Sequence, residues 1–150
     1  MIEIVNVRKL KAIAKDPGVT ACAIVRSMTY PIAGVEQLDV LSPSRNLFFW
    51  YRDMAKRGMW NRDAFDSEYV SRFLEEIRSS QSSRRALTDL WIRSRDGEHI
   101  VLGCYCADEV MCHRSIIAGL LSGTGAEVRT ETGNDYSIYY EQYHFISQQF

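Results

Sequence analysis

Short apolar runs alternate along the chain with longer stretches in which apolar residues recur every three or four positions. Residues 2–7, 19–25 and 100–102 are apolar runs that predict buried strands, and shorter strands are expected within residues 35–40 and 126–131. Helical spacing follows the first strand and returns over residues 45–58, 65–77 and 81–97. The clearest helical stripe is expected to face the core and comprises Phe65, Tyr69, Val70, Phe73, Leu74 and Ile77.

The order of these elements determines the expected fold class. Strands that alternate with helices are typical of an α/β protein, so we expect a central, mainly parallel sheet with helices on both faces, a Rossmann-like three-layer arrangement. The length of 150 residues suits one domain with its own core, and a single α/β domain is expected over residues 1–150. The tyrosine-rich tail is expected to form a helix that docks on the sheet or on a second subunit, through a face made of Ile138, Tyr139, Gln142, Tyr143 and Ile146.

Composition restricts the class of protein and of partner. An apolar fraction of 46% and a charged fraction of 25% are typical of globular proteins, and no window is long and apolar enough to span a bilayer, so no membrane partner is expected. No signal peptide is recognised, because the N-terminal apolar run soon turns basic, and we expect a cytoplasmic protein with reduced thiols. The net charge of −1 does not favour nucleic acid as the partner. The oligomeric state is left open.

The segment CYCADEVMCHRS, residues 104–115, holds three of the four cysteines. It lies between a predicted strand and a predicted helix, the kind of junction at which α/β proteins usually bind ligands. Cys104 and Cys106 are two positions apart, so on a strand their side chains are expected to face the same side. With Cys112 and His113 they offer three thiolates and an imidazole, a complete tetrahedral ligand set for zinc, although the spacing differs from the usual C-x-x-C type. Zinc is the candidate cofactor of this first interpretation.

A second interpretation makes Cys112 a nucleophile, with His113 beside it. A thiol near a helix N-terminus and next to Arg114 lies in positive potential, which lowers its pKa. The backbone N–H groups there, together with Arg114 and the hydroxyl of Ser115, are suited to hold a phosphate or another oxyanion. The candidates for the opposite wall of such a site come from the long loop and the helix upstream, and they are Ser42, Ser44 and Arg45.

A third interpretation is structural. Free cysteine is among the most buried residue types, so Cys104 and Cys106 are also candidates for core positions under the loop, as is Cys22. Asp108 and Glu109 are expected to be solvated, as paired acids in a loop usually are. The chain contains neither a G-x-G-x-x-G nor a G-x-x-x-x-G-K-[ST] motif, so the standard dinucleotide and triphosphate loops are not expected.

The stretch HIVLGCYCADEVMCHRSIIAGLL resembles the hallmark of the bacterial and viral proteins grouped as domain of unknown function 488. In that family an apolar strand is followed by a Cys, a short loop and Cys-His-Arg at the start of a helix. DVLSPSRNLFFWYRD and MWNRDAFDSEYVSRFLEEI are similar to its Leu-Ala-Pro-Ser segment and its Trp-x-x-Tyr helix, so the resemblance extends from Leu41 to Val128. Cys106 stands where the family commonly has Glu, and the resulting C-x-C is similar to a feature of domain of unknown function 4326. The resemblance implies a compact α/β domain and no particular reaction.

These patterns favour an enzyme that acts on a small phosphorylated or nucleotide-like substrate. In this hypothesis Arg114 and the helix N-terminus hold the anion, while Cys112 or His113 carries the chemistry. Two alternatives remain at this point: a non-enzymatic zinc-bearing module that binds nucleic acid or protein, and a protein that sequesters a nucleotide signal without turnover. The sequence leaves open the substrate and whether turnover occurs.

Overall fold

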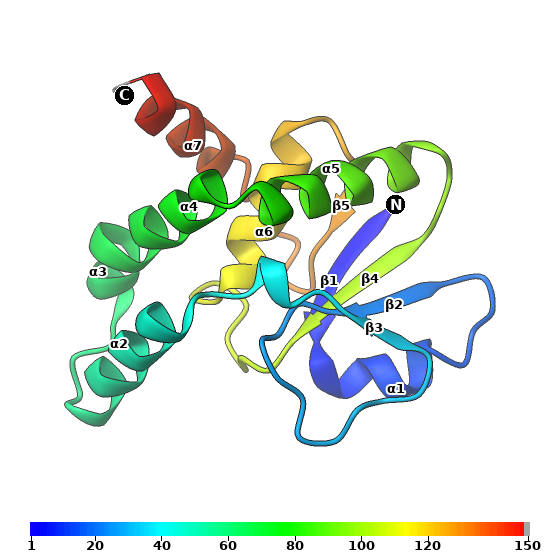
Figure 1. Cartoon of the computed structure of the whole chain (residues 1–150), viewed down its shortest axis with the longest axis horizontal. Helices are drawn as coiled ribbons and strands as arrows, with labels where there is room; N and C mark the ends of the chain where they lie inside the picture. Colours follow the sequence, from blue (N-terminus) through cyan, green and yellow to red (C-terminus); the bar gives the residue numbers. More distant parts are fainter. Residues whose placement is uncertain (149–150) are drawn as a thin grey trace.

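The sheet at the centre of the fold has five strands. The computed structural model describes residues 1–148, with side chains through residue 144 (Figure 1). Its strands run in the order β3-β2-β4-β1-β5, and every pairing is parallel. The predicted α/β class is therefore confirmed. The strands are β1 (Ile2–Asn6), β2 (Thr20–Ala23), β3 (Val35–Gln37), β4 (Ile100–Cys104) and β5 (Val128–Arg129).

Helices cover the two faces of the sheet unequally. One face carries only a 3-10 turn (Val7–Lys9) and the short helix α1 (Leu10–Ile13), which close a small apolar core. The other side carries a much larger apolar core and most of the helices (Figure 1). Three layers result, as predicted. These helices are α2 (Arg45–Lys56), α3 (Arg62–Ala64), α4 (Val70–Ser79), α5 (Gln81–Arg95), α6 (His113–Gly123) and α7 (Ile138–Gln148).

The local sequence explains where the main elements lie. The central strand β4 is buried at all five positions, as its continuous apolar run predicts. All six residues of the predicted stripe over 65–77 are buried, on a π-helical turn (Phe65–Tyr69) that leads into α4. Ser44 caps α2 by accepting a hydrogen bond of 3.1 Å from the N–H of Leu47, and Gly58, with φ of +68°, follows the end of that helix.

The tail helix α7 packs on α6, because α6 already covers this part of the sheet. Tyr139 is buried in that contact, whereas Ile138 is 51% exposed, so the predicted face is only partly right. Ile146, which was placed on the same face, lies outside the residues whose side chains are described. None of the helices described within residues 1–148 is long and apolar enough to cross a membrane.

Gly119 allows the segment before α7 to approach α6 closely. A Cβ atom at this position would lie 2.0 Å from the carbonyl oxygen of Tyr136, which is backbone and cannot rotate away. We expect Gly119→Ala to lower the free energy of unfolding by about 2–3 kcal/mol, as overpacking does. Urea denaturation measures this change, and Ser122→Ala on the same helix is the control, with an expected change within about 0.5 kcal/mol. Equal stability of the two variants would contradict the close approach.

The strand order places a crevice at the carboxyl ends of β1 and β4. These neighbouring strands lead to opposite faces, since the chain continues from β1 into α1 and from β4 into α6. Where connections diverge in this way, open α/β sheets bind their ligands. The cysteine-rich segment 104–115 follows β4 and therefore lies at this edge of the sheet.

Candidate functional site

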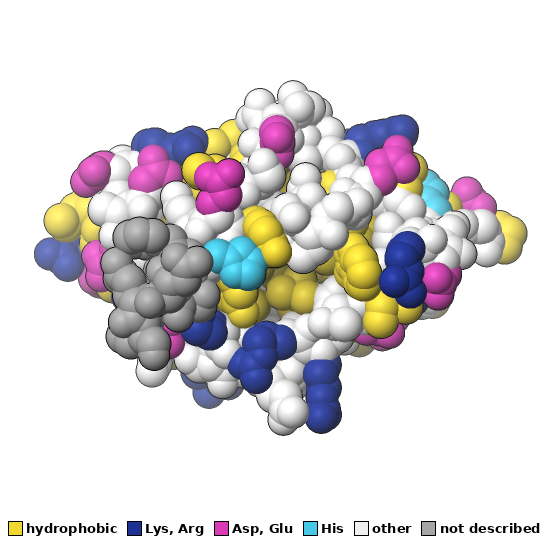
Figure 2. All heavy atoms as spheres, turned by 90° about the horizontal axis from the view of Figure 1, so that it is seen from above, with side chains coloured by type: hydrophobic (Ala, Val, Ile, Leu, Met, Phe, Trp, Pro, Cys, Tyr) yellow, Lys and Arg dark blue, Asp and Glu magenta, His cyan; other side chains and the backbone are white. Residues whose placement is uncertain are grey.

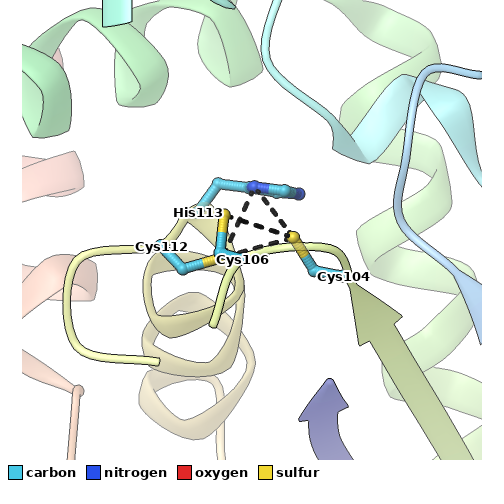
Figure 3. Close-up of side chains that lie close together, drawn as sticks. All are labelled: Cys104, Cys106, Cys112 and His113. Atoms are coloured by element: carbon cyan, nitrogen blue, oxygen red, sulfur yellow. Dashed lines mark hydrogen bonds between the residues drawn. The ribbon is translucent and has the colours of Figure 1, made fainter. Parts of the chain in front are cut away.

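Three cysteines and one histidine converge where β4 leads into α6 (Figure 3). Cys104 is the last residue of β4, and Cys106 follows in the loop. Cys112 is the N-cap of α6 with an extended backbone (φ −126°, ψ 149°), and His113 is the first helical residue. Strand end, loop and helix start thus each contribute to one group, which we call the thiol–imidazole cluster (Cys104, Cys106, Cys112 and His113).

The donor atoms of the cluster all lie within 4.8 Å of one another. The Sγ atom of Cys104 is 3.8 Å from that of Cys106 and 3.2 Å from that of Cys112. The Nδ1 atom of His113 is 3.6 Å from Sγ of Cys104 and 3.8 Å from Sγ of Cys112. The prediction that Cys104 and Cys106 face the same side is therefore confirmed, and the group has the donor set of a tetrahedral metal site.

The orientation of the His113 ring is fixed from the opposite side of the cluster. Its Nε2 atom lies 2.7 Å from the carbonyl oxygen of Ile24, which follows β2. A carbonyl oxygen only accepts hydrogen bonds, so Nε2 carries the proton and donates it. In the neutral ring Nδ1 is then unprotonated, and its lone pair faces the sulfur atoms. The ring of Phe73 packs edge-on against the imidazole, with 5.7 Å between the ring centroids.

Two thiols of the cluster, those of Cys104 and Cys112, differ in acidity. Hydrogen bonds shared with Cys106 and Cys112, aided by the charge of Arg114, lower the pKa of Cys104 to about 4 despite its burial. Burial, followed by the hydrogen bond to Cys104, raises the pKa of Cys112 well above its usual value. A thiolate is thus more stable on Cys104, at the end of the strand, than on Cys112, the residue that the sequence favoured as nucleophile.

One protein-family model matches residues 5–125, namely DUF488-N3a, described as the active DUF488-N3 subclade. The chain belongs to this family. The resemblance seen in the sequence is therefore confirmed, whereas the likeness of the C-x-C to domain of unknown function 4326 stays a prediction. Searches of the curated proteins and of the solved structures found no match. The matched region of this DUF488 protein contains the whole thiol–imidazole cluster and ends before β5.

Arg114, the third residue of the DUF488-type Cys-His-Arg motif, points into the protein. Its side chain is almost completely buried, and Nη1 donates a 2.6 Å hydrogen bond to the carbonyl oxygen of Cys106. Asn6 donates to the same oxygen at 3.0 Å, and Nη2 of Arg114 lies 3.6 Å from a carboxylate oxygen of Glu131. Arg114 therefore holds the backbone of the cysteine loop in place. Ser115 is also fully buried and donates to the carbonyl oxygen of Cys112 at 2.8 Å.

Above the cluster lies a cleft of about 1060 Å³, which we call the basic cleft. Cys104, Cys106 and His113 form part of its lining, whereas Cys112 lies behind them and Arg114 and Ser115 do not contribute to the lining. The volume is at the upper end of the usual range for ligand pockets. The remaining walls come from the segments after β1 and β2 and from the start of α2.

The three residues predicted for the opposite wall have different environments. Ser42 and Arg45 line the basic cleft, as expected of a wall. Ser44 instead binds Glu76, because both its N–H (2.7 Å) and its hydroxyl donate to that carboxylate. The carboxylate of Glu76 thus occupies the N-terminus of α2, so an anion in the cleft would bind to side chains rather than to this helix end.

Sequence reasoning missed most of the basic and aromatic residues of the cleft. Arg8 and Lys11 follow β1 directly, and Arg26 follows β2. Their positions just after predicted strands could have identified them as candidates, since the carboxyl ends of parallel strands share one edge of the sheet. The missed aromatic residues on the cleft walls are Tyr30, Phe48, Phe49, Tyr51, Trp60, Tyr69 and Tyr105.

Proposed function

We propose that this DUF488 protein is an enzyme that binds a small phosphorylated or nucleotide-like substrate in the basic cleft and acts on it at the thiol–imidazole cluster. The charge of the cleft carries the proposal. No Asp or Glu is among the residues described around it, although the whole chain has a net charge of −1. Such local concentration of one charge attracts ligands of the opposite charge. The cations of the lining are Arg8, Lys11, Arg26 and Arg45.

The face of the molecule in Figure 2 lacks this separation of charge. On the face seen from above in Figure 1, basic and acidic side chains are interspersed around apolar ones (Figure 2). Many arginines elsewhere also pair with a carboxylate one helical turn away, as Arg57 does with Asp53 and Arg62 with Asp66. The concentration of cations in the cleft is therefore a local feature that supports an anionic ligand.

Arg26 and Arg45 approach the cleft from two different segments. Nε of Arg26 donates a 2.9 Å hydrogen bond to the carbonyl oxygen of Pro43, which joins the end of β2 to the start of α2. That bond restrains the guanidinium at the lining of the cleft, where its Nη groups would be donors for an oxyanion. Arg45 is the first residue of α2, and its charge adds to this side of the cleft.

Exposed aromatic rings in the cleft are suited to bind the part of the ligand that carries no charge. The side chains of Tyr30 (84% exposed), Phe48 (41%), Phe49 (54%) and Tyr105 (55%) all belong to the lining of the cleft. Large exposed rings around one hollow mark a ligand site, and a planar base stacks on such rings. Cations together with aromatic rings favour a ligand that carries both a phosphate and a heterocycle.

The thiol–imidazole cluster forms the inner end of the cleft and is where we place the chemistry. Of the residues that the sequence nominated as catalytic, His113 is the one that reaches the lining, whereas Cys112 supports it from behind. Cys104, whose thiol has a lowered pKa, also belongs to the lining.

Calorimetric titration with nucleosides and their monophosphates and diphosphates tests this proposal. We expect the phosphorylated members to bind, and Arg45→Gln and Lys11→Gln each to weaken binding about tenfold or more, since a hydrogen bond to a charged group contributes about 1.5–3 kcal/mol. Arg85→Gln, an exposed change on α5, is the matched control and is expected to bind like the parent. Chromatography of the recovered ligand separates turnover from sequestration.

Two results would overturn the proposal. If Arg45→Gln, Lys11→Gln and Arg85→Gln bound every phosphorylated compound as the parent does, the basic cleft would not be the binding site. If a bound nucleotide were always recovered unchanged, the chain would be a sequestering protein and not an enzyme.

A further inference from the structure

We propose that the thiol–imidazole cluster holds one zinc ion. Of its four ligands, Cys106 is the most exposed, lies on the side of the basic cleft and can be replaced from there. The inference deepens the proposed function, because it supplies a metal at the point where the substrate would react. It stands on separate observations, however, and its test does not use a nucleotide.

The first observation is the size of the cluster. Zinc binds sulfur at about 2.3 Å and nitrogen at about 2.0–2.1 Å, so a tetrahedral site requires about 3.8 Å between two sulfurs and about 3.6 Å between sulfur and nitrogen. Cys104 and Cys106 are 3.8 Å apart, and His113 lies 3.6 and 3.8 Å from its two sulfur neighbours. The distance between Cys104 and Cys112, 3.2 Å, would need to increase by about 0.6 Å. Three of these four distances thus match the metal-bound form, and all donor atoms lie within 4.8 Å of one another, so small shifts of Cys106 and Cys112 would complete the site.

The second observation is the direction of the imidazole. Because Nε2 of His113 donates to the carbonyl oxygen of Ile24 at 2.7 Å, the lone pair on Nδ1 is aimed at the centre of the sulfur atoms. Zinc-bound histidines typically donate their other ring N–H to a carbonyl or a carboxylate in this way. The contact joins residues 89 positions apart in the chain, and it does not depend on any of the thiols.

The third observation is the buried positive charge of Arg114, which the protein's own groups balance only in part. Arg114 is 1% exposed, and its Nε atom has no hydrogen-bond partner within the described part of the chain. The carboxylate of Glu131 lies 3.6 Å away and is shared with Lys9. Three thiolates, one neutral imidazole and one Zn²⁺ carry a net charge of −1, which would compensate a buried guanidinium beside them.

The donor set also selects the kind of metal. Thiolates and imidazole suit zinc, whereas calcium and magnesium require oxygen ligands. A disulfide within the cluster would need two sulfurs at about 2.05 Å, much closer than any pair here. The sulfur atoms would therefore move less on binding a metal ion than on forming a disulfide.

The four ligands differ in their access to solvent. Cys104, Cys112 and His113 are buried, with exposed fractions of 2%, 1% and 5%, whereas Cys106 is half-buried in the loop and faces the cleft. Two cysteines and one histidine with a water in the fourth position form a ligand set that catalytic zinc sites use. We infer that Cys106 is the ligand most readily replaced, so that the ion would become accessible from the cleft.

Metal analysis of the full chain, purified without chelator, tests the site. We expect about one zinc per chain, and after exchange to Co²⁺ an absorption spectrum of tetrahedral thiolate coordination. Cys112→Ser is expected to lose the metal, whereas Cys106→Ala is expected to retain it with a weaker affinity. Cys22→Ser is the matched control with full zinc content, because Cys22 is buried elsewhere in the large core.

The outcome remains decisive even if Cys112→Ser does not fold. The parent chain alone must then show the cobalt spectrum and protection of its cluster thiols from alkylation by bound metal. A parent chain that takes up no zinc or cobalt, or full zinc content in folded Cys112→Ser, would overturn the inference. Nucleotide binding by a metal-free chain would leave the proposed function standing, whereas zinc without nucleotide binding would remove the proposed function only.

Discussion

Phe73→Ala is expected to lower the free energy of unfolding by about 3–5 kcal/mol. The ring of Phe73 is fully buried on α4, where it stacks on Tyr69 with 6.3 Å between ring centroids and contacts the edge of His113 at 5.7 Å. Its removal leaves a cavity that the stiff helices around it fill only in part. Urea denaturation, followed by circular dichroism, measures the change.

The same substitution is expected to disturb the thiol–imidazole cluster, because His113 loses the ring that packs against it. The control is Phe49→Ala, since Phe49 is 54% exposed on the wall of the basic cleft. Its unfolding free energy is expected to stay within about 0.5 kcal/mol of the parent, while its nucleotide affinity falls. A loss of less than about 1 kcal/mol for Phe73→Ala would show that the position is not close-packed.

The part of the fold that follows from local pattern was predictable from the sequence. The continuous apolar run at Ile100, Val101 and Leu102 indicates a strand buried on both faces, and β4 is the central strand. The two-residue spacing of Cys104 and Cys106 predicted a common direction, and their sulfur atoms do lie 3.8 Å apart although the strand ends at Cys104 and Cys106 belongs to the loop. The strand-to-helix junction as a candidate site follows from the same reasoning.

Arg114 shows where such reasoning fails. A cation at a helix N-terminus is a natural candidate to hold an anion, yet the whole stretch of α6 from His113 to Leu121 is buried. This helix is covered by the sheet, α4 and α7, so it has no solvent-facing side on which to place the guanidinium. The buried side chain binds the backbone of Cys106 instead, and the apolar run IIAGLL after the motif is the signal that the helix is enclosed.

The cleft was harder to foresee because its residues come from distant segments. Arg8, Arg26 and Arg45 become neighbours of one hollow only after the order β3-β2-β4-β1-β5 is known. The hydrogen bond from His113 to Ile24 uses a backbone carbonyl, which every residue possesses, so it cannot be predicted from the residue type at position 24. Similarly, the binding of Ser44 by Glu76 depends on the packing of α2 against α4 and removes a hydroxyl that the sequence assigned to the ligand.

Glu109 was predicted to be a solvated loop residue, and this prediction was wrong. Glu109→Ala has the second large expected effect. The side chain is 4% exposed, and its carboxylate accepts hydrogen bonds from the N–H of Glu131 (2.7 Å), the hydroxyl of Tyr136 (2.6 Å) and the hydroxyl of Thr132. These donors all lie in the segment between β5 and α7, so one carboxylate ties that segment to the cysteine loop. These three donors satisfy its charge.

We expect Glu109→Ala to lower the free energy of unfolding by about 3 kcal/mol, because it removes the buried, charged acceptor of three hydrogen bonds and such bonds contribute about 1.5–3 kcal/mol each. The change also releases Glu131, whose carboxylate lies 3.6 Å from Nη2 of Arg114. Arg114 then holds the cysteine loop less firmly. If the cluster binds zinc, its zinc affinity is expected to fall about 10–100-fold, as is typical when a residue that hydrogen-bonds to a metal ligand is lost. Denaturant titration and zinc competition with a chelator measure the two effects.

Asp108→Ala is the matched control, since Asp108 is the adjacent acid, is exposed, and accepts one hydrogen bond from the N–H of Val110 at 3.0 Å. Its expected cost is about 0.5–1.5 kcal/mol, with zinc affinity unchanged. Glu109→Gln keeps the size of the side chain and retains one carbonyl acceptor, so its loss of stability is expected to lie between those of the two alanine variants. Equal stability of Glu109→Ala and Asp108→Ala would mean that the buried carboxylate does not hold the two loops together, and that the position of Arg114 is set by α6 alone.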